Sequence, residues 1–175
     1  MISHKVLNMI TILGVGNLLM RDEGFGPQLI MHLQDNYTMP SGVDLVDGGT
    51  SGIYLAPIVE DSRRLLVIDV LAMDGAAGEI HHFDGCDLGG AGLQLRMSPH
   101  QVGLLEIIDI CRLRGRVPEE IKVIGIIPEK VELGLELSPL LQNKIGAISQ
   151  LVIQQIEEWT NARVVAGPEL AEPTL

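Results

Sequence analysis

Three side chains that can bind a metal ion or transfer a proton are expected at the ends of strands or at the start of a helix. Glu23 lies in the loop after a first apolar run, Asp69 ends the most apolar run, and His100 follows Ser98-Pro99 at the expected start of a helix. Two carboxylates and an imidazole suit a divalent first-row metal such as nickel or zinc. A helix N-terminus disfavours imidazolium, so His100 would be kept in the neutral form that a ligand requires.

The same three residues also have an ordinary structural explanation. An acid just after a strand is commonly a helix cap or a solvated loop residue, and the spacing of Glu23, Asp69 and His100 matches no short metal-binding motif. Asp69 is the strongest single candidate, because an acid that ends a run of buried aliphatic residues must be paired, protonated or bound to a metal.

The other histidines and the two cysteines give weaker signals. His81 and His82 are adjacent on an expected strand and point to opposite faces, so they cannot chelate one ion together. Cys86 and Cys111 form no CxxC pair and have no neighbouring base in sequence, which is typical of incidental thiols in a reducing compartment. The roles of both thiols stay open.

The turn Gly14-Val15-Gly16 supplies half of a dinucleotide-binding fingerprint, which makes a nucleotide-binding domain one alternative. However, Leu19 stands where the third glycine is required, and Asp22 and Glu23 would place two carboxylates beside a pyrophosphate. That arrangement is electrostatically unfavourable. Whether NAD or ATP raises the melting temperature would decide this alternative.

The elements that must position these residues follow from the apolar periodicity. We expect strands over residues 9–15, 43–47, 65–70, 79–83 and 123–127. We expect helices from residue 26, over residues 53–61 and 100–113, and from Pro139 through Trp159. This alternation predicts a single three-layer α/β domain, with helices on both faces of a twisted, mostly parallel five-stranded sheet that has one antiparallel edge strand. Ligands of such sheets bind at the carboxyl ends of the strands, where Glu23, Asp69 and His100 are expected together.

Length, composition and charge limit the organisation and the partners. The 175 residues are 46% hydrophobic and 20% charged, which is typical of one globular domain. A formal net charge of −11 argues against nucleic acid and against a basic membrane-binding surface. No apolar run approaches the roughly 20 residues of a membrane helix. We expect a domain over residues 1–161, a flexible C-terminal tail over residues 162–175, and a cytoplasmic monomer.

Several blocks of sequence occur together in a characteristic order. They are residues 12–26 (ILGVGNLLMRDEGFG), 47–52 (DGGTSG), 67–70 (VIDV), 98–104 (SPHQVGL) and 125–129 (GIIPE). In these blocks the chain resembles the hydrogenase maturation endopeptidases, which process the large subunit of nickel-iron hydrogenases. The likeness extends over residues 9–159, and the SPHQ block is similar to that of members serving uptake-type hydrogenases.

The resemblance assigns roles to individual residues. The family's metal ligands are an acid in the opening block, an aspartate after the central strand and a later histidine, which fall here on Glu23, Asp69 and His100. Some relatives have aspartate at the first of these positions. Asn17 and the backbone of Gly48-Gly49-Thr50 would position the substrate chain, since glycines permit close approach.

The resemblance implies an endopeptidase, aspartyl-type or metal-dependent, that removes the C-terminal extension of the hydrogenase large-subunit precursor after nickel insertion. The three ligands would recognise nickel supplied by the precursor, and zinc or another divalent ion would substitute. The ion would polarise the scissile carbonyl or activate a water, or it would only position the substrate. The alternative is a non-catalytic nickel or zinc carrier or sensor with the same three ligands.

Overall fold

The computed structural model describes residues 9–85 and 99–167, and of residues 99–103 only the backbone. The main sheet contains β1 (Ile10–Val15), β3 (Val43–Gly49), β4 (Arg64–Val70), β5 (Ile80–Asp84) and β6 (Glu120–Ile126). Their order across the sheet is β3-β1-β4-β6-β5, and all neighbours are parallel except β5, which runs antiparallel to β6. The predicted sheet, including its antiparallel edge strand, is thereby confirmed, with β4 at its centre.

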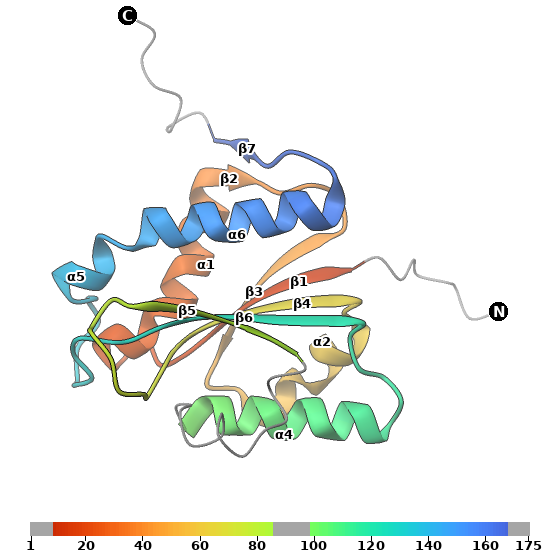
Figure 1. Ribbon diagram of the computed structural model, residues 1–175, viewed down its shortest axis with the longest axis horizontal. Coiled ribbons are helices and arrows are strands. Elements are labelled where there is room, and N and C mark those ends of the chain that lie inside the picture. Colours follow the sequence, from red (N-terminus) through yellow and green to blue (C-terminus); the bar gives the residue numbers. More distant parts are fainter. Residues whose placement is uncertain (1–8, 86–98, 168–175) are drawn as a thin grey trace, which may run out of the picture.

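Helices cover both faces of the sheet (Figure 1). One face packs against α1 (Phe25–Asn36) and α6 (Ile145–Thr160), and the other against α2 (Ala56–Asp61) and α4 (Pro99–Leu113). Along β4, Leu66 and Ile68 belong to the core on the α1 and α6 side, whereas Leu65 and Val67 belong to the core on the α2 and α4 side. This alternation is the pattern of a strand buried on both faces.

Short helices connect the larger elements. They are the 3-10 helices η1 (Arg21–Gly24) and η2 (Gly52–Leu55), and α5 (Pro139–Gln142). The single last helix predicted from Pro139 is wrong in one respect, because α5 ends at Gln142 and α6 begins at Ile145. Within the two described ranges, none of the helices has both the length and the apolar composition to cross a membrane.

Two short strands that the sequence did not predict pair outside the main sheet. β2 (Tyr37–Thr38) is antiparallel to β7 (Val165–Ala166), and the Gly167 N–H donates to the carbonyl oxygen of Asn36 at 2.6 Å. Residues 165–167, which lie within the segment 162–175 predicted to be a flexible tail, therefore pair next to the end of α1. The rest of that tail, from residue 168, lies outside the described residues, as does Cys86.

Candidate active site

The parallel strands end at one edge of the sheet, and the turns after β1 and β3 meet there (Figure 1). The Gly16 N–H donates to the carbonyl oxygen of Gly49 at 3.0 Å, which joins the turn after β1 to the last residue of β3. After the first turn, η1 contacts the neighbouring strand β4. The carboxyl edge therefore brings together the blocks around residues 14–26, 47–50 and 69, as the sequence predicted.

Two glycines allow α1 to begin directly against the ends of the strands. A Cβ on Gly26 would lie 2.6 Å from the carbonyl oxygen of Ile68, and one on Gly14 would lie 2.6 Å from Cγ1 of Ile30. A backbone oxygen cannot give way as a flexible side chain can, so glycine is required at position 26. This close approach holds η1, with Glu23, at the carboxyl end of β4.

Asp69 lies in β4, one residue before the strand ends, and is fully buried. Its Oδ1 accepts a hydrogen bond from the N–H of Val70 at 2.7 Å. Side chains two residues apart on a strand share a face, so Asp69 lies on the same face as Leu65 and Val67, which pack toward α2 and α4. The carboxylate therefore belongs to the α4 side of the central strand.

Helix α4 places His100 in its first turn. The helix runs opposite to the parallel strands: near its end, Arg112 Nη2 donates to the carbonyl oxygen of Gly85 at 3.5 Å, and the Gly85 N–H donates to that of Ile121 near the start of β6. The N-terminus of α4 consequently lies at the carboxyl edge, on the face of Asp69 (Figure 1). The side chain of His100 is outside the described part of the chain, so its contact with the carboxylates stays a prediction.

The adjacent acids Asp22 and Glu23 have different environments. Asp22 is fully buried, and its Oδ2 accepts the N–H groups of Glu129 at 2.9 Å and Lys130 at 2.8 Å. Its Oδ1 accepts the N–H of Ser138 at 2.6 Å. Glu23 is half-buried. Because backbone amides occupy both oxygens of Asp22, Glu23 is the acid of this turn that suits a ligand role.

Asn17 shapes the turn that contains Glu23. Its Oδ1 accepts the N–H of Leu19 at 3.0 Å, and its own N–H donates to the carbonyl oxygen of Glu23 at 3.1 Å. These bonds give Asn17 a conformational role in the turn. Its predicted contact with a substrate chain stays a prediction.

Gly48 and Gly49 are the last two residues of β3, and Thr50 begins the turn that follows. Gly48 is buried, whereas Thr50 is exposed. Gly49 has a φ of +47°, a left-handed conformation that favours glycine, and its N–H donates to Asp47 Oδ1 at 2.9 Å. The turn therefore presents backbone and a threonine side chain at the edge, which is compatible with the predicted role in positioning a substrate.

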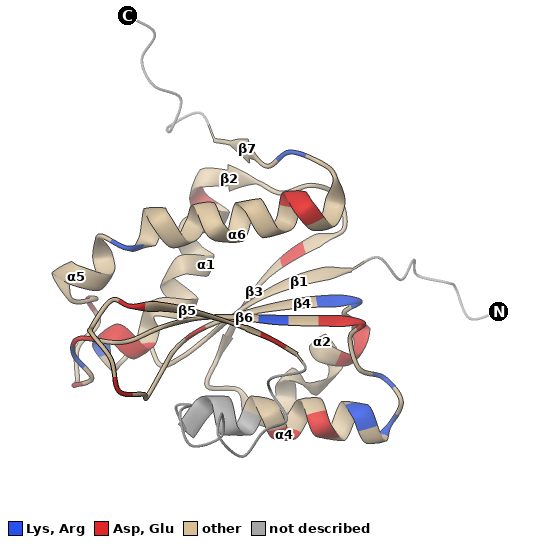
Figure 2. Ribbon diagram, in the orientation of Figure 1, with Lys and Arg blue, Asp and Glu red and all other residues tan. Residues whose placement is uncertain are grey.

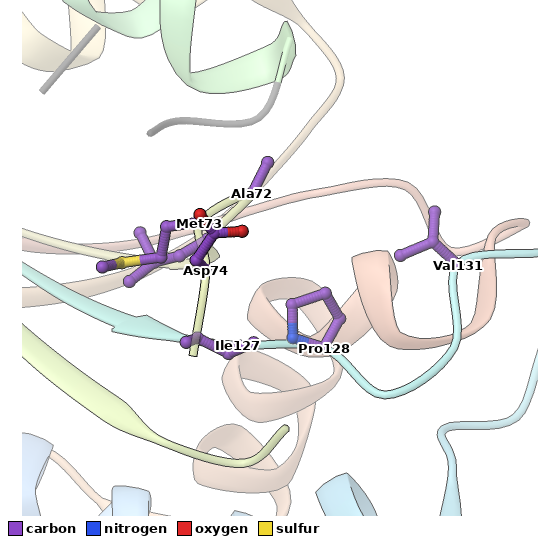
Figure 3. A pocket seen from close by; sticks show the side chains of 7 residues that line it. Ala72, Met73, Asp74, Ile127, Pro128 and Val131 are labelled. Atoms are coloured by element: carbon purple, nitrogen blue, oxygen red, sulfur yellow. The ribbon is translucent and has the colours of Figure 1, made fainter. Parts of the chain in front are cut away.

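A cleft of about 650 Å³ opens at this edge between the segments that follow β4 and β6 (Figure 3). Its lining consists of Leu71, Ala72, Met73, Asp74, Ile127, Pro128 and Val131. The two walls are joined by backbone hydrogen bonds from Leu71 to Ile126 at 2.9 Å and from Gly78 to Ile127 at 2.8 Å. The sequence alone did not indicate this cleft, because its walls come from two segments that are far apart in the chain.

Comparison with known proteins identifies the chain. A sequence profile described as hydrogenase maturation protease matches residues 27–155. The chain belongs to the hydrogenase maturation protease family. The resemblance drawn from the sequence blocks is thereby confirmed, and the chain is an endopeptidase that acts in hydrogenase maturation.

Relatives of this hydrogenase maturation protease agree in sequence and in fold. The hydrogenase expression/formation protein HupD of Bradyrhizobium diazoefficiens is 34% identical over 161 residues, which cover 87% of this chain and 80% of HupD. The hydrogenase 2 maturation protease of Escherichia coli K12 is 29% identical over 150 residues, covering 85% of this chain and 91% of that protein. The structure of the hydrogenase maturating endopeptidase HybD from Escherichia coli matches with a TM-score of 0.83 at 26% identity, covering 92% of this chain and 99% of HybD.

The metal site of this protease remains a prediction. Among the residues with described side chains, no group of three or more His, Cys, Asp and Glu is placed to hold a metal ion. His100 is not among those residues, so the predicted set of Glu23, Asp69 and His100 is not tested by that result.

Proposed function

We propose that this protease removes the C-terminal extension from the large-subunit precursor of a nickel-iron hydrogenase, and that it recognises nickel already bound to that precursor. The supporting observation is the packing of η1 against the carboxyl end of the central strand. This packing brings the turn of Glu23 to the strand that contains the buried Asp69. The start of α4, with His100, lies at the same edge and on the same face.

The donor atoms of Glu23, Asp69 and His100 are of the types that bind nickel. Carboxylate oxygens and an imidazole nitrogen are ligands for nickel and zinc, and three protein ligands leave positions for groups of the precursor. The nickel is part of the substrate in this proposal. When bound, it supplies a positive charge that polarises the scissile carbonyl or activates a water. The roles of Glu23, Asp69 and His100 are to engage that ion and to fix the scissile bond relative to it.

The cleft is the proposed binding place for the precursor chain next to the scissile bond. Its first lining residue, Leu71, follows Asp69 by two positions, so the cleft begins just after the end of the strand that contains the buried carboxylate. Met73 and Val131 offer apolar contacts, whereas Asp74 favours a cationic group in the same stretch of substrate. The turn after β3 lies at the same sheet edge and would support the chain further along.

The decisive experiment compares nickel-loaded with nickel-free precursor and measures the mass of the large subunit after incubation. We expect the wild-type protease to shorten only the loaded form. Asp69→Ala and His100→Ala should each lose nickel-dependent binding and cleavage. The expected loss is at least roughly 100-fold, because even residues that only support metal ligands cost about 10- to 100-fold when replaced.

A matched control removes a carboxylate elsewhere on the same sheet. Asp44 is exposed near the start of β3, away from the carboxyl edge, so Asp44→Asn should process the loaded precursor normally. Full processing by Asp69→Ala or His100→Ala would contradict the assignment of these residues as nickel ligands. Equal cleavage of loaded and nickel-free precursor would contradict the proposed recognition of nickel.

A further inference from the structure

The buried carboxylate of Asp22 joins two segments that are far apart in the chain. Its three hydrogen-bond partners are the backbone N–H groups of Glu129, Lys130 and Ser138, which are 107, 108 and 116 residues away in sequence. Hydrogen bonds to an ionised acceptor are roughly twice as strong as neutral ones. Both oxygens are used, so the carboxylate fixes the segment 129–138 against η1.

Further contacts run alongside these three bonds. The Arg21 N–H donates to the carbonyl oxygen of Gly134 at 2.8 Å, and the Gly134 N–H donates to that of Leu19 at 2.9 Å. The guanidinium of Arg21 forms an ion pair with Glu132 at 3.1 Å. The segment 129–138 is therefore bound along its length to the turn that contains Glu23.

Each side of this connection leads to a part of the candidate active site. On one side, Glu23 follows Asp22 directly in the chain. On the other side, the bonded amides of Glu129 and Lys130 lie between Pro128 and Val131, which line the cleft. A displacement of the Asp22 carboxylate must therefore move Glu23 relative to the cleft wall.

We propose that Asp22 is a positioning residue for peptide hydrolysis, which acts by fixing Glu23 and the cleft wall at Pro128 and Val131 in one arrangement. The proposal rests on the proposed function, in which Glu23 engages the nickel of the precursor and the cleft holds its chain. A displaced wall weakens binding of the chain and raises KM. A displaced Glu23 misplaces the scissile bond and lowers kcat.

The test replaces Asp22 by asparagine, which has the same size but exchanges one acceptor oxygen for a donor facing N–H groups. Hydrogen exchange at the amides of Glu129, Lys130 and Ser138 should become faster than in the wild type. For nickel-loaded precursor we expect KM to rise, kcat to fall and kcat/KM to drop by about 100-fold, the scale that a misplacement of about 1 Å can cause.

The control is Thr11, a buried polar residue near the start of β1, at the amino-terminal ends of the parallel strands. Thr11 Oγ1 and Ser62 Oγ are hydrogen-bonded at 2.6 Å, and both residues are buried. Thr11→Val removes this bond and should lower the melting temperature. At an assay temperature at which both variants are folded, Thr11→Val should keep wild-type kcat and KM, whereas Asp22→Asn should not.

A second pair of variants breaks the same connection from the other side if Asp22→Asn does not fold. Ser138 has a φ of −58°, which suits proline, so Ser138→Pro removes the N–H that donates to Asp22. Ser138→Ala keeps that N–H but, like the proline variant, removes the hydroxyl that caps α5. We expect kcat/KM of Ser138→Pro to be about tenfold below that of Ser138→Ala, the effect of one hydrogen bond to a charged group.

Two results overturn the positioning role: unchanged kcat and KM in folded Asp22→Asn, or equal kcat/KM in the two Ser138 variants. A separate measurement, the cleavage of nickel-free precursor by the wild type, tests the proposed function itself. If the wild type cleaves both forms equally, the Asp22 and Ser138 comparisons are made on either form and decide the positioning role in the same way.

Discussion

Gly26 marks the point at which α1 meets the sheet. Its Cα faces the carbonyl oxygens of Val15 and Ile68, which belong to the two strands β1 and β4. Neither oxygen can move without shifting its strand, and β4 contains Asp69. The arrangement of the candidate active site therefore depends on a position that has no side chain.

Gly26→Ala should lower the free energy of unfolding by about 3 kcal/mol, because a methyl group at this position overlaps backbone atoms and forces the helix away from the strands. Urea denaturation measures this effect. Its matched control is Gly146→Ala in α6, where a Cβ would meet nothing within 4 Å. That substitution should raise the free energy of unfolding by about 0.5–1 kcal/mol. Equal stability of Gly26→Ala and the wild type would contradict the close approach.

The residues of the candidate site differ in whether the sequence alone could predict their roles. Glu23, Asp69 and His100 follow from a simple rule, since residues at strand ends and helix starts of a parallel sheet meet at one edge. Asp22 could not be interpreted in this way. Its partners are backbone N–H groups more than 100 residues away, and a backbone amide leaves no signature in the sequence.

At the scale of elements, periodic apolar patterns predicted those helices and strands that bury a face. The continuous run at residues 65–68 gave the central strand, and its burial on both faces is observed. The two-residue strands β2 and β7 have no such pattern, because their pairing depends on contacts across the fold. The break before Ile145 was missed because the apolar period continues across it, with Leu141, Ile145 and Ile148 all buried.

The packing of α4 against α2 encloses the thiol of Cys111. The side chain is fully buried, and Sγ lies 4.0 Å from the carbonyl oxygen of Ala56. Burial raises the pKa of this thiol above its ordinary value, and the nearby carboxylate of Glu60 acts in the same direction. Arg114 and Arg116 oppose the shift to a smaller extent.

This raised pKa predicts a loss of stability at alkaline pH. The folded state keeps the thiol protonated at pH values where the unfolded chain releases the proton, so the folded state binds more protons. The contribution is fully present below the unfolded pKa of about 8.5 and is lost as the pH rises from there toward the folded pKa. Urea denaturation between pH 7 and pH 10 should show a less steep decline for Cys111→Ala than for the wild type. Identical slopes would contradict the burial effect.

At the scale of the whole molecule, the acidic residues are spread over several elements and basic residues lie among them (Figure 2). Several arginines form ion pairs with acids: Arg63 with Glu119, Arg64 with Glu120, and both Arg114 and Arg116 with Glu60. Each of these four arginines therefore lies beside a carboxylate of another segment. The excess of carboxylates is thus spread over the molecule, whereas the two carboxylates of the candidate site, Glu23 and Asp69, lie in η1 and near the end of β4.

The order of strands in the sheet also predicts the order in which the strands pair during folding. β5 precedes β6 in the chain, yet its neighbour in the sheet is β6, which lies between β4 and β5. During folding, β1, β3 and β4 can pair among themselves first. β5, together with the cleft wall at residues 71–74, has no strand to join until β6 is in place.

Pulsed hydrogen exchange during refolding checks this order. We expect the amides of Ile10–Val15 and Arg64–Val70 to gain protection before those of Ile80–Asp84, because non-local pairing that waits for an intervening strand is slow. Protection of β5 before β1 and β4 would contradict this order.

The same order applies to a chain that emerges from the ribosome. The three strands on the β3 side are complete once residue 70 has been synthesised, but the Asp22 carboxylate finds its last partner only at Ser138. The connection between the cleft wall and the turn of Glu23 is therefore complete only after Ser138 has been synthesised. Since the proposed function needs this arrangement, we expect a ribosome-bound chain that stops before Ser138 to leave a precursor uncut.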